Sequence, residues 1–437
     1  MNILMMTNTY TPLVGRLERS VREFTMEFRR RGHRAVIVAP VFEGMPNDEE
    51  DVIRVPAIQH FNGSDFAVKL PMPPTVTRLL VRFRPDVIHA HHPFLIGNTA
   101  LRLAHTHKIP LVFTHHTLFE QYTHYLPTET PTTERFVVEL ATGYANMCDR
   151  VFAPSQSVAR LLWQRGVEAP ITVVPTGVDI PRFSRGDRLR GRRALGLPND
   201  ALVIGHVGRL APEKNLGFLA DAVAQFLRRA PNARFLVVGS GPSEQDIRHA
   251  CKQERVEPQL KMAGVLKGQA LIDAYHAMDV FVFASKSETQ GLVVAEAMAA
   301  RVPVIAIDAP GVREVVEDGR NGRLLPSEDR AAFITALREF AALTPTQRQA
   351  MANLARHTAE QLAMPRCAEL ALRHYADMLV QGYRRRQRHQ GKWWTALRRV
   401  RAEWDVLKTV TKATAVAVKE TRKPQPAFAR RRSLRAR

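Results

Sequence analysis

Short apolar runs alternate with longer stretches of helical period along most of this chain, and this alternation constrains the fold more than any other feature. The runs are rich in β-branched residues and continuously apolar, as in strands that are buried on both faces. The first series occupies residues 2–7, 34–40, 86–91, 110–116, 150–155 and 171–177, with helix-like segments at 17–31 and 156–165. The second series occupies residues 202–210, 234–241, 260–265, 280–285 and 303–308. Repeated strand–helix–strand units predict parallel sheets with right-handed crossovers.

A polar stretch with several Gly and Pro residues, 179–200, interrupts the alternation and indicates two sheets rather than one. The length of 437 residues agrees with this, because single cores rarely grow beyond about 250–300 residues. We expect an α/β protein with two doubly wound, Rossmann-like parallel-sheet domains that face a cleft. Ligands of such sheets bind outside the carboxyl ends of the strands. The expected divisions are 1–178 and 179–362 for the domains, 363–382 for a helix that crosses back to the first domain, and 383–437 for a basic helical tail.

Cysteine usage and hydropathy limit the possible classes of protein. The three cysteines are far apart and odd in number, which suggests neither a disulfide framework nor a thiolate zinc site and fits a reducing cytosol. The amino terminus lacks a basic leader, and no run approaches the roughly 20 apolar residues that span a bilayer. Any contact with a membrane is therefore expected to be peripheral.

Two cations follow the first strand of the second series, in the stretch "GRLAPEKN". Arg209 and Lys214 stand five residues apart at an expected strand-to-helix turn, where two positive charges suit a phosphate or diphosphate. Alone, the pair is a weak signal, and two solvated surface cations are the more common explanation.

Two carboxylates stand in the small and apolar stretch "SETQGLVVAE". Glu288 lies in the loop after the expected strand 280–285, and Glu296 lies inside a helix that begins at about Gly291. The free N–H groups at such a helix start attract anions, and a carboxylate offers two acceptor oxygens to vicinal hydroxyls. One acid could therefore hold a hexose and the other a ribose, with phosphates between them.

The stretch "ETQGLVVAE" resembles the E-x7-E pattern of retaining, family 4-like glycosyltransferases with the GT-B fold. The likeness extends through most of residues 1–380. It is supported by "GRLAPEKN", "VVPTGVD" at 173–179, "GSGP" at 239–242, "DVFVFAS" at 279–285, "EAMAARVPVIA" at 296–306 and "GVREVVEDGRNGRLL" at 311–325.

The resemblance implies a role for each matching residue. Arg209 and Lys214 would neutralise the diphosphate of a nucleotide-sugar donor, Glu288 would contact the donor sugar, and Glu296 would bind the ribose hydroxyls. The remaining implied positions are Gly15 in the first-domain loop near the diphosphate, Gln290, Gly291 and Leu292 at the donor, and His116 in the cleft. The neighbouring His115 is interpreted as an ordinary core histidine. The chain departs from the family at Arg16 and Arg301, where glycine is usual.

A metal site is not expected, although eight histidines fall between His89 and His124. No carboxylate or cysteine is interleaved among them at ligand spacing, and no Asp-x-Asp motif occurs in the chain. Metal-dependent nucleotide-sugar transferases of the other major fold use that motif, so a metal-independent site is expected here. The family also implies retention of anomeric configuration, which we interpret as front-face displacement.

The stretch "THHTLFEQYTHYLP", residues 114–127, resembles a segment of diacylglycerol glucosyltransferases. If it is helical, it brings Phe119, Tyr122 and Tyr125 close to one face beside the cleft, where a lipid acceptor would bind. Ordinary core packing is the alternative explanation.

The net charge of the chain is concentrated in its tail. From Gly382 onward, 18 Lys and Arg stand against three Asp and Glu, so this segment carries +15 of the total +21. Its apolar residues Trp393, Leu397, Val400, Trp404 and Leu407 recur at helical spacing opposite a basic face, and Trp394 lies beside them. This pattern is typical of a helix that lies on an anionic membrane. A coiled-coil partner helix and nucleic-acid attraction are the alternatives.

The sequence thus predicts a cytoplasmic, peripheral hexosyltransferase at the inner face of the membrane. It would move a hexose from a nucleotide sugar, UDP-glucose in preference to GDP-mannose, to a membrane glycerolipid such as diacylglycerol. The same chemistry on a soluble or saccharide acceptor is the alternative within enzymes. A nucleic-acid-binding protein that acts through its tail is the alternative of another class, although the body is only mildly basic.

Overall fold

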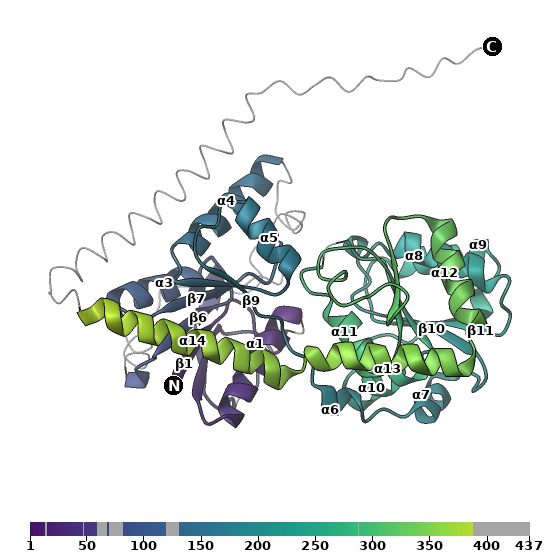
Figure 1. Cartoon of the computed structure of the whole chain (residues 1–437), viewed down its shortest axis with the longest axis horizontal. Coiled ribbons are helices and arrows are strands. Elements are labelled where there is room, and N and C mark those ends of the chain that lie inside the picture. The colour runs from purple at the N-terminus through teal and green to yellow at the C-terminus, as the bar shows by residue number, and fades with distance from the viewer. Residues whose placement is uncertain are drawn as a thin grey trace, which may run out of the picture.

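The chain forms two parallel β-sheets, each covered by helices on both faces (Figure 1). The structure is a computed structural model that describes residues 1–13, 15–46, 48–58, 68–69, 82–118, 131–286 and 288–387. We call the half with the first sheet the first lobe and the half with the second sheet the second lobe. The doubly wound α/β class expected from the alternation of strands and helices is confirmed.

The sheet of the first lobe has the order β3-β2-β1-β6-β7-β8-β9, and every neighbouring pair in it is parallel. Its strands are β1 (Asn2–Met6), β2 (Arg34–Pro40), β3 (Val52–Val55), β6 (Val87–Ala90), β7 (Leu111–Thr114), β8 (Arg150–Ala153) and β9 (Ile171–Val173). A separate antiparallel pair consists of β4 (Ala57–Ile58) and β5 (Val68–Lys69).

Alternate residues of these strands enter two different cores, which is why the strands read as continuously apolar. Ile3 and Met5 pack under α1 (Arg16–Arg30) and α14 (Met364–Gln387). Leu4 and Met6 face the opposite core, which is closed by α3 (Ile96–His107), α4 (Pro131–Asn146) and α5 (Gln156–Gln164).

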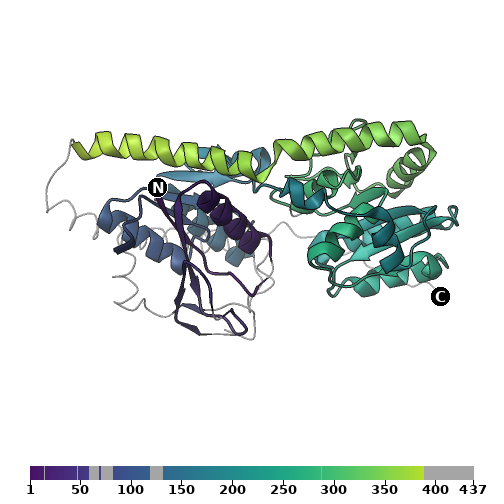
Figure 2. The same cartoon turned by 90° about the horizontal axis from the view of Figure 1, so that it is seen from below.

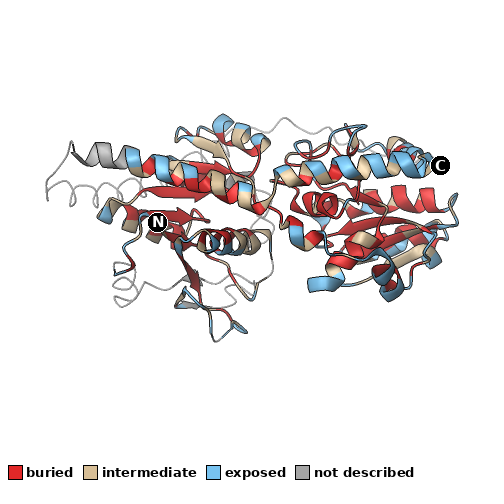
Figure 3. Cartoon of the chain, turned by 60° about the horizontal axis from the view of Figure 1, so that its bottom comes forward, coloured by how far each residue is buried: buried red, intermediate tan, exposed pale blue. Residues whose placement is uncertain are grey.

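The sheet of the second lobe has the order β12-β11-β10-β13-β14-β15 and is also parallel throughout. Its strands are β10 (Leu202–Val207), β11 (Ala233–Val238), β12 (Leu260–Met262), β13 (Val280–Phe283), β14 (Val304–Ile307) and β15 (Gly322–Leu325). One face is covered by α6 (Ile180–Phe183), α7 (Arg188–Leu195), α10 (Gly268–Ala277), α11 (Leu292–Ala299) and α13 (Pro345–Gln361). The other is covered by α8 (Leu216–Leu227), α9 (Glu244–Gln253) and α12 (Arg330–Ala342), and two short 3₁₀ turns are η3 (Pro212–Lys214) and η4 (Glu257–Gln259). Figure 3 shows the buried strands of both lobes beneath helices whose outer sides are exposed.

The polar stretch 179–200 is not an open linker, because it contains α6 and α7. Arg192 of α7 is completely buried, and its guanidinium donates to Asp279 and to the carbonyl oxygens of Ala201 and Ala277. A buried charge is tolerated when it is paired and hydrogen-bonded in this way. The sequence pattern alone gives no sign of these partners, so the segment reads as polar surface.

The chain crosses between the lobes twice, and the two crossings touch. The Val178 N–H donates to the carbonyl oxygen of Leu362 at 2.8 Å, and the Met364 N–H donates to the carbonyl oxygen of Val178 at 3.0 Å. Only glycine fits at Gly177, since a Cβ there would lie 2.3 Å from the Cα of Met364. After the second crossing α14 packs against α1, so α13 and α14 run end to end along both lobes (Figures 1 and 2).

Candidate active site

Glu288 and Glu296 lie where the second sheet opens toward the first lobe. β13 ends at Phe283, and α11 begins after Gly291, whose φ of 68° is a left-handed conformation that suits glycine. Both carboxylates are buried, with Glu288 1% and Glu296 2% exposed. Buried carboxylates require partners, and each of these two has two.

Lys214 is the partner that the second lobe supplies to Glu288. It ends η3, which follows β10, the strand next to β13. Its Nζ lies 2.6 Å from Oε1 of Glu288, and its side chain is 8% exposed. Burial, and then the charge of Arg16, lower the pKa of Lys214 to about 6, so its positive charge near neutral pH depends on the anion beside it. Arg209 lies beside this group with a more exposed side chain that pairs with Glu213.

The first lobe supplies a cation to each carboxylate through the first turns of α1. The Arg16 guanidinium pairs with Oε2 of Glu288, and the Arg19 guanidinium pairs with Oε1 of Glu296. Gly15, the N-cap residue of α1, is adjacent to Arg16. These ion pairs join the first-lobe loop to both acids, so residues more than 270 positions apart in the chain form one cluster.

Tyr275 of α10 holds the second oxygen of Glu296. Its hydroxyl donates to Oε2 at 2.8 Å, and its ring is completely buried between Phe183 and Phe281. Burial and the Glu296 charge raise the pKa of Tyr275 well above its usual value, so the hydroxyl remains a donor at neutral pH.

No role was predicted from the sequence for Arg19 or Tyr275, and Arg16 was identified only as a departure from the family. Arg19 could have been found from its spacing, because residues three apart share one face of a helix. Nothing in the spacing connects Tyr275 with Glu296.

His116 lies on the first-lobe side of the same cluster. Its carbonyl oxygen accepts from Thr289 Oγ1 at 3.1 Å, and its Nε2 lies 2.9 Å from Nδ1 of His91. Burial, and then the neighbouring histidines, hold the pKa of His116 well below its usual value, so both rings of this pair are neutral. His115 points to the core, where its ring packs edge-on against Phe113.

Gln290 of the second lobe forms hydrogen bonds with the first lobe. Its side-chain amide donates to the carbonyl oxygen of Thr176 at 2.6 Å and accepts from the Thr176 N–H at 2.7 Å. Leu292, the next expected donor residue after Gly291, packs in the second-lobe core. The expected acceptor and membrane residues Phe119, Tyr122, Tyr125, Trp393, Trp394 and Trp404 lie outside the described residues.

Arg301, the second departure from the family, follows α11 with a φ of 63°. This is the left-handed conformation that favours glycine at the end of a helix. Its guanidinium donates to Asn353 Oδ1 at 2.7 Å. The backbone here is therefore the one expected of glycine, although the residue is arginine.

Among the described residues, no group of three or more His, Cys, Asp or Glu is arranged to hold a metal ion. Cys148, Cys251 and Cys367 are buried free thiols. In the same part of the chain, no helix has the length and hydropathy needed to cross a bilayer.

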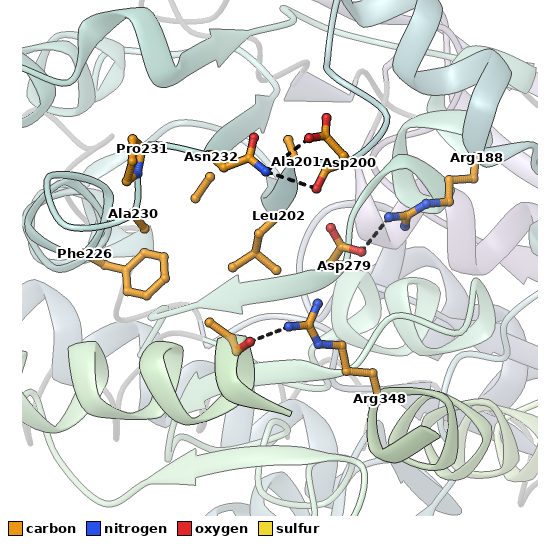
Figure 4. Close-up of a pocket in the computed structure, with 12 residues that line it drawn as sticks. Arg188, Asp200, Ala201, Leu202, Phe226, Ala230, Pro231, Asn232, Asp279 and Arg348 are labelled. Atoms are coloured by element: carbon orange, nitrogen blue, oxygen red, sulfur yellow. Dashed lines mark hydrogen bonds and ion pairs between the residues drawn. The ribbon is translucent and has the colours of Figure 1, made fainter. Parts of the chain in front are cut away.

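A hollow of about 370 Å³ lies at the other end of the second sheet (Figure 4). Its lining includes Arg188, Leu202, Phe226, Asp279 and Arg348. Leu202 and Asp279 stand at the amino ends of β10 and β13, whereas Lys214 follows the carboxyl end of β10 and Glu288 and Glu296 follow that of β13. The hollow is therefore separate from the candidate active site.

Two family models match the chain in succession. The model described as Glycosyltransferase Family 4 matches residues 17–182, and the model described as Glycosyl transferases group 1 matches residues 187–358. Each therefore covers one lobe.

Similar proteins agree with these matches. The alpha-monoglucosyldiacylglycerol synthase of Streptococcus pneumoniae is 28% identical over 75% of this chain and 76% of its own length. The D-inositol 3-phosphate glycosyltransferase of Actinosynnema mirum is 33% identical over 69% of this chain and 75% of its own length. The crystal structure of Anabaena HepE in complex with UDP and glucose has the same fold, with a TM-score of 0.68, 23% identity, and coverage of 86% of this chain and 99% of that one. The chain therefore belongs to the family 4 glycosyltransferases with the GT-B fold, which are also called glycosyl transferases group 1.

Proposed function

We propose that this glycosyltransferase moves a hexose, glucose in the first instance, from a nucleotide sugar to a membrane glycerolipid such as diacylglycerol, with retention of anomeric configuration. The observation that carries the proposal is the pair of buried acids, Glu288 and Glu296, which follow β13, together with Lys214, which follows the adjacent β10 and contacts Glu288. Acids in that position can accept from hydroxyls of two sugars while the neighbouring cation neutralises phosphate.

In this proposal the donor spans the cluster from one acid to the other. Glu288 accepts from hydroxyls of the transferred sugar, and Glu296, held by Tyr275, accepts from the ribose. Arg209, Lys214 and the start of α11 at Gly291 and Leu292 neutralise the diphosphate, and Gly15 lets the first-lobe backbone approach it.

The proposed reaction needs no carboxylate nucleophile, because Glu288 is committed to hydroxyls. The acceptor attacks the face from which the nucleotide leaves, through an oxocarbenium-like transition state. The departing phosphate oxygen takes the proton of the acceptor hydroxyl. His116, neutral and fixed by His91, lies beside the reacting sugar and can accept a hydrogen bond there.

Lipid is the proposed acceptor for three reasons. A relative 28% identical to this chain is named alpha-monoglucosyldiacylglycerol synthase. The stretch 114–127 resembles the diacylglycerol glucosyltransferases, and the +15 tail suits an anionic membrane surface. We propose that the tail, 383–437, places the enzyme peripherally at the inner face of the membrane, and that 1–178 and 179–362 act as the acceptor and donor domains.

The direct test is mass spectrometry of products made from UDP-glucose or GDP-mannose in the presence of total membrane lipid. A hexosyl glycerolipid from the wild-type chain, and none from the Glu288→Gln variant, supports the proposal. A hexosyl product in the water-soluble fraction alone would refute the lipid acceptor.

The tail is tested by sedimentation with anionic liposomes. Truncation after Gly382 should release the protein from them while donor hydrolysis continues, and neutral liposomes serve as the control. Continued sedimentation of the truncated protein would show that the tail is not the anchor.

The second candidate is the same chemistry on a soluble acceptor. It is favoured by the relative named D-inositol 3-phosphate glycosyltransferase, which is 33% identical to this chain. Turnover that does not depend on added lipid would support this candidate over the first.

A further inference from the structure

The first turns of α1 carry two positive charges where a helix least favours them. Arg16 and Arg19 lie at the amino-terminal end of this helix, whose partial positive charge repels cations. This unfavourable placement is compensated, because each guanidinium forms an ion pair with one of the two buried acids of the other lobe. Arg16 is of particular interest, since it occupies the position at which the family usually has a glycine.

Both oxygens of Glu288 are covered by a cation in the free protein. Lys214 binds Oε1 and Arg16 binds Oε2. With both cations in place Glu288 is only 1% exposed, so a sugar hydroxyl can reach the carboxylate only when one cation moves away. Lys214 is fixed, with a side chain 8% exposed, whereas the Arg16 side chain is 37% exposed and comes from the other lobe on a longer arm. Arg16 is therefore the cation that moves.

The displaced guanidinium remains among other positive charges. Lys214 and Arg209 lie beside it, and Arg16 contributes to lowering the pKa of Lys214, after the larger effect of burial. Once the Arg16 guanidinium leaves the Glu288 carboxylate, another anion in the same place would stabilise its charge. The donor brings two phosphates into the same place, and a guanidinium fork matches phosphate oxygens.

We propose that Arg16 is a donor-binding residue that exchanges the Glu288 carboxylate for the diphosphate of the nucleotide sugar. The inference rests on the proposed function, because it takes the donor to lie along Glu288 and Lys214. In this exchange the free protein keeps its buried acid paired, and the bound protein gains a first-lobe contact to phosphate in addition to Arg209 and Lys214.

The test is calorimetric titration of the full-length protein with UDP and GDP, and with uridine and guanosine as phosphate-free references. Arg16→Ala should weaken binding of the preferred nucleoside diphosphate at least tenfold, as expected for loss of a charge-assisted hydrogen bond, and leave nucleoside binding unchanged. Arg16→Lys, which keeps the charge but not the fork, should recover part of the loss. Arg22→Ala is the matched control, since Arg22 lies on the same helix and pairs with Glu23.

Each result decides between the possibilities. If Arg16→Ala binds the diphosphate as tightly as the wild type or more tightly, Arg16 only competes for Glu288, and the inference is wrong. Should Arg16→Ala fail to fold, the same comparison is made with Arg16→Gln, which keeps a polar side chain. A wild-type protein that binds neither nucleoside diphosphate would overturn the proposed function itself, whatever the variants do.

Discussion

Replacing Tyr275 with phenylalanine tests whether a single buried hydroxyl positions Glu296. The change removes one O–H and leaves the ring between Phe183 and Phe281, so no large cavity forms. The hydroxyl lies 2.8 Å from a carboxylate oxygen in a site with no exposure. A hydrogen bond to a charged group contributes about 1.5–3 kcal/mol, so unfolding of the second lobe should become easier by about 2 kcal/mol. For a lobe of this size that lowers Tm by about 4–8 °C.

The chain contains a matched control in Tyr375. This tyrosine is equally buried, and its hydroxyl lies 2.6 Å from Nδ1 of His89, whose pKa burial lowers to about 3. The acceptor is therefore neutral, and Tyr375→Phe should cost only about 0.5–1.5 kcal/mol. Differential scanning calorimetry of both variants measures the two costs on the same scale.

The two variants should also differ in catalysis. If ribose hydroxyls displace Arg19 from Glu296, as proposed, Tyr275 is the side chain among the described residues that still holds the carboxylate, so Tyr275→Phe should raise the donor KM several-fold. Tyr375→Phe lies outside the donor site and should leave the KM unchanged. Equal stability losses together with an unchanged KM in Tyr275→Phe would refute the reasoning that the hydroxyl holds Glu296.

Three further outcomes are expected. Glu288→Gln should slow sugar transfer at least ~100-fold, because it removes a charged acceptor from the reacting sugar. The control Glu254→Gln, which breaks a peripheral ion pair with Arg228, should leave the rate of transfer unchanged. Initial rates measure both variants, and near-normal turnover of Glu288→Gln would show that Glu288 is not in the site. Burial lowers the pKa of His115 and of His206 to about 4, so as the pH falls below about 6.5 these histidines are protonated in the unfolded chain before they are protonated in the folded protein. The free energy of unfolding, measured by urea titration, should therefore be about 2 kcal/mol lower per histidine at pH 5 than at pH 7. An unchanged free energy of unfolding between pH 7 and pH 5 would contradict this. Arg301→Gly should be about 1 kcal/mol more stable than Arg301→Ala. Both variants lose the hydrogen bond to Asn353, and only glycine adopts the left-handed φ without strain. Equal urea midpoints of the two variants would show that this backbone is not strained.

The sequence was most informative where one local pattern decides the outcome. Strands such as 34–40 match the structure because a parallel strand buried on both faces must be apolar throughout. The short strands β3 and β15 were not predicted, because four residues at or near a sheet edge carry little pattern. The buried Arg192 shows the same limit, since its partners come from distant positions.

The candidate site shows a similar division between local and distant information. Glu288, Glu296, Arg209 and Lys214 were singled out because each lies in a recognisable stretch, either after the carboxyl end of a strand or within the helix that follows it. Tyr275 could not, because only the packing of α10 against α11 brings its hydroxyl to Glu296. The roles of these residues in donor binding remain predictions that the experiments above test.

The contact between the two crossings at Val178 determines how the lobes can move. Two backbone hydrogen bonds hold Val178 between Leu362 and Met364, so drawing the lobes straight apart would break both. A rotation of one lobe about Val178 would keep both hydrogen bonds, and atoms close to Val178 would move least in it. The contact between Thr176 and Gln290 lies next to this hinge point, whereas Arg16 reaches Glu288 from α1, a different segment of the first lobe. A small rotation would therefore change the distance between that guanidinium and its carboxylate more than it changes the Thr176–Gln290 contact, so rotation of the lobes would open or close the proposed donor site at Glu288.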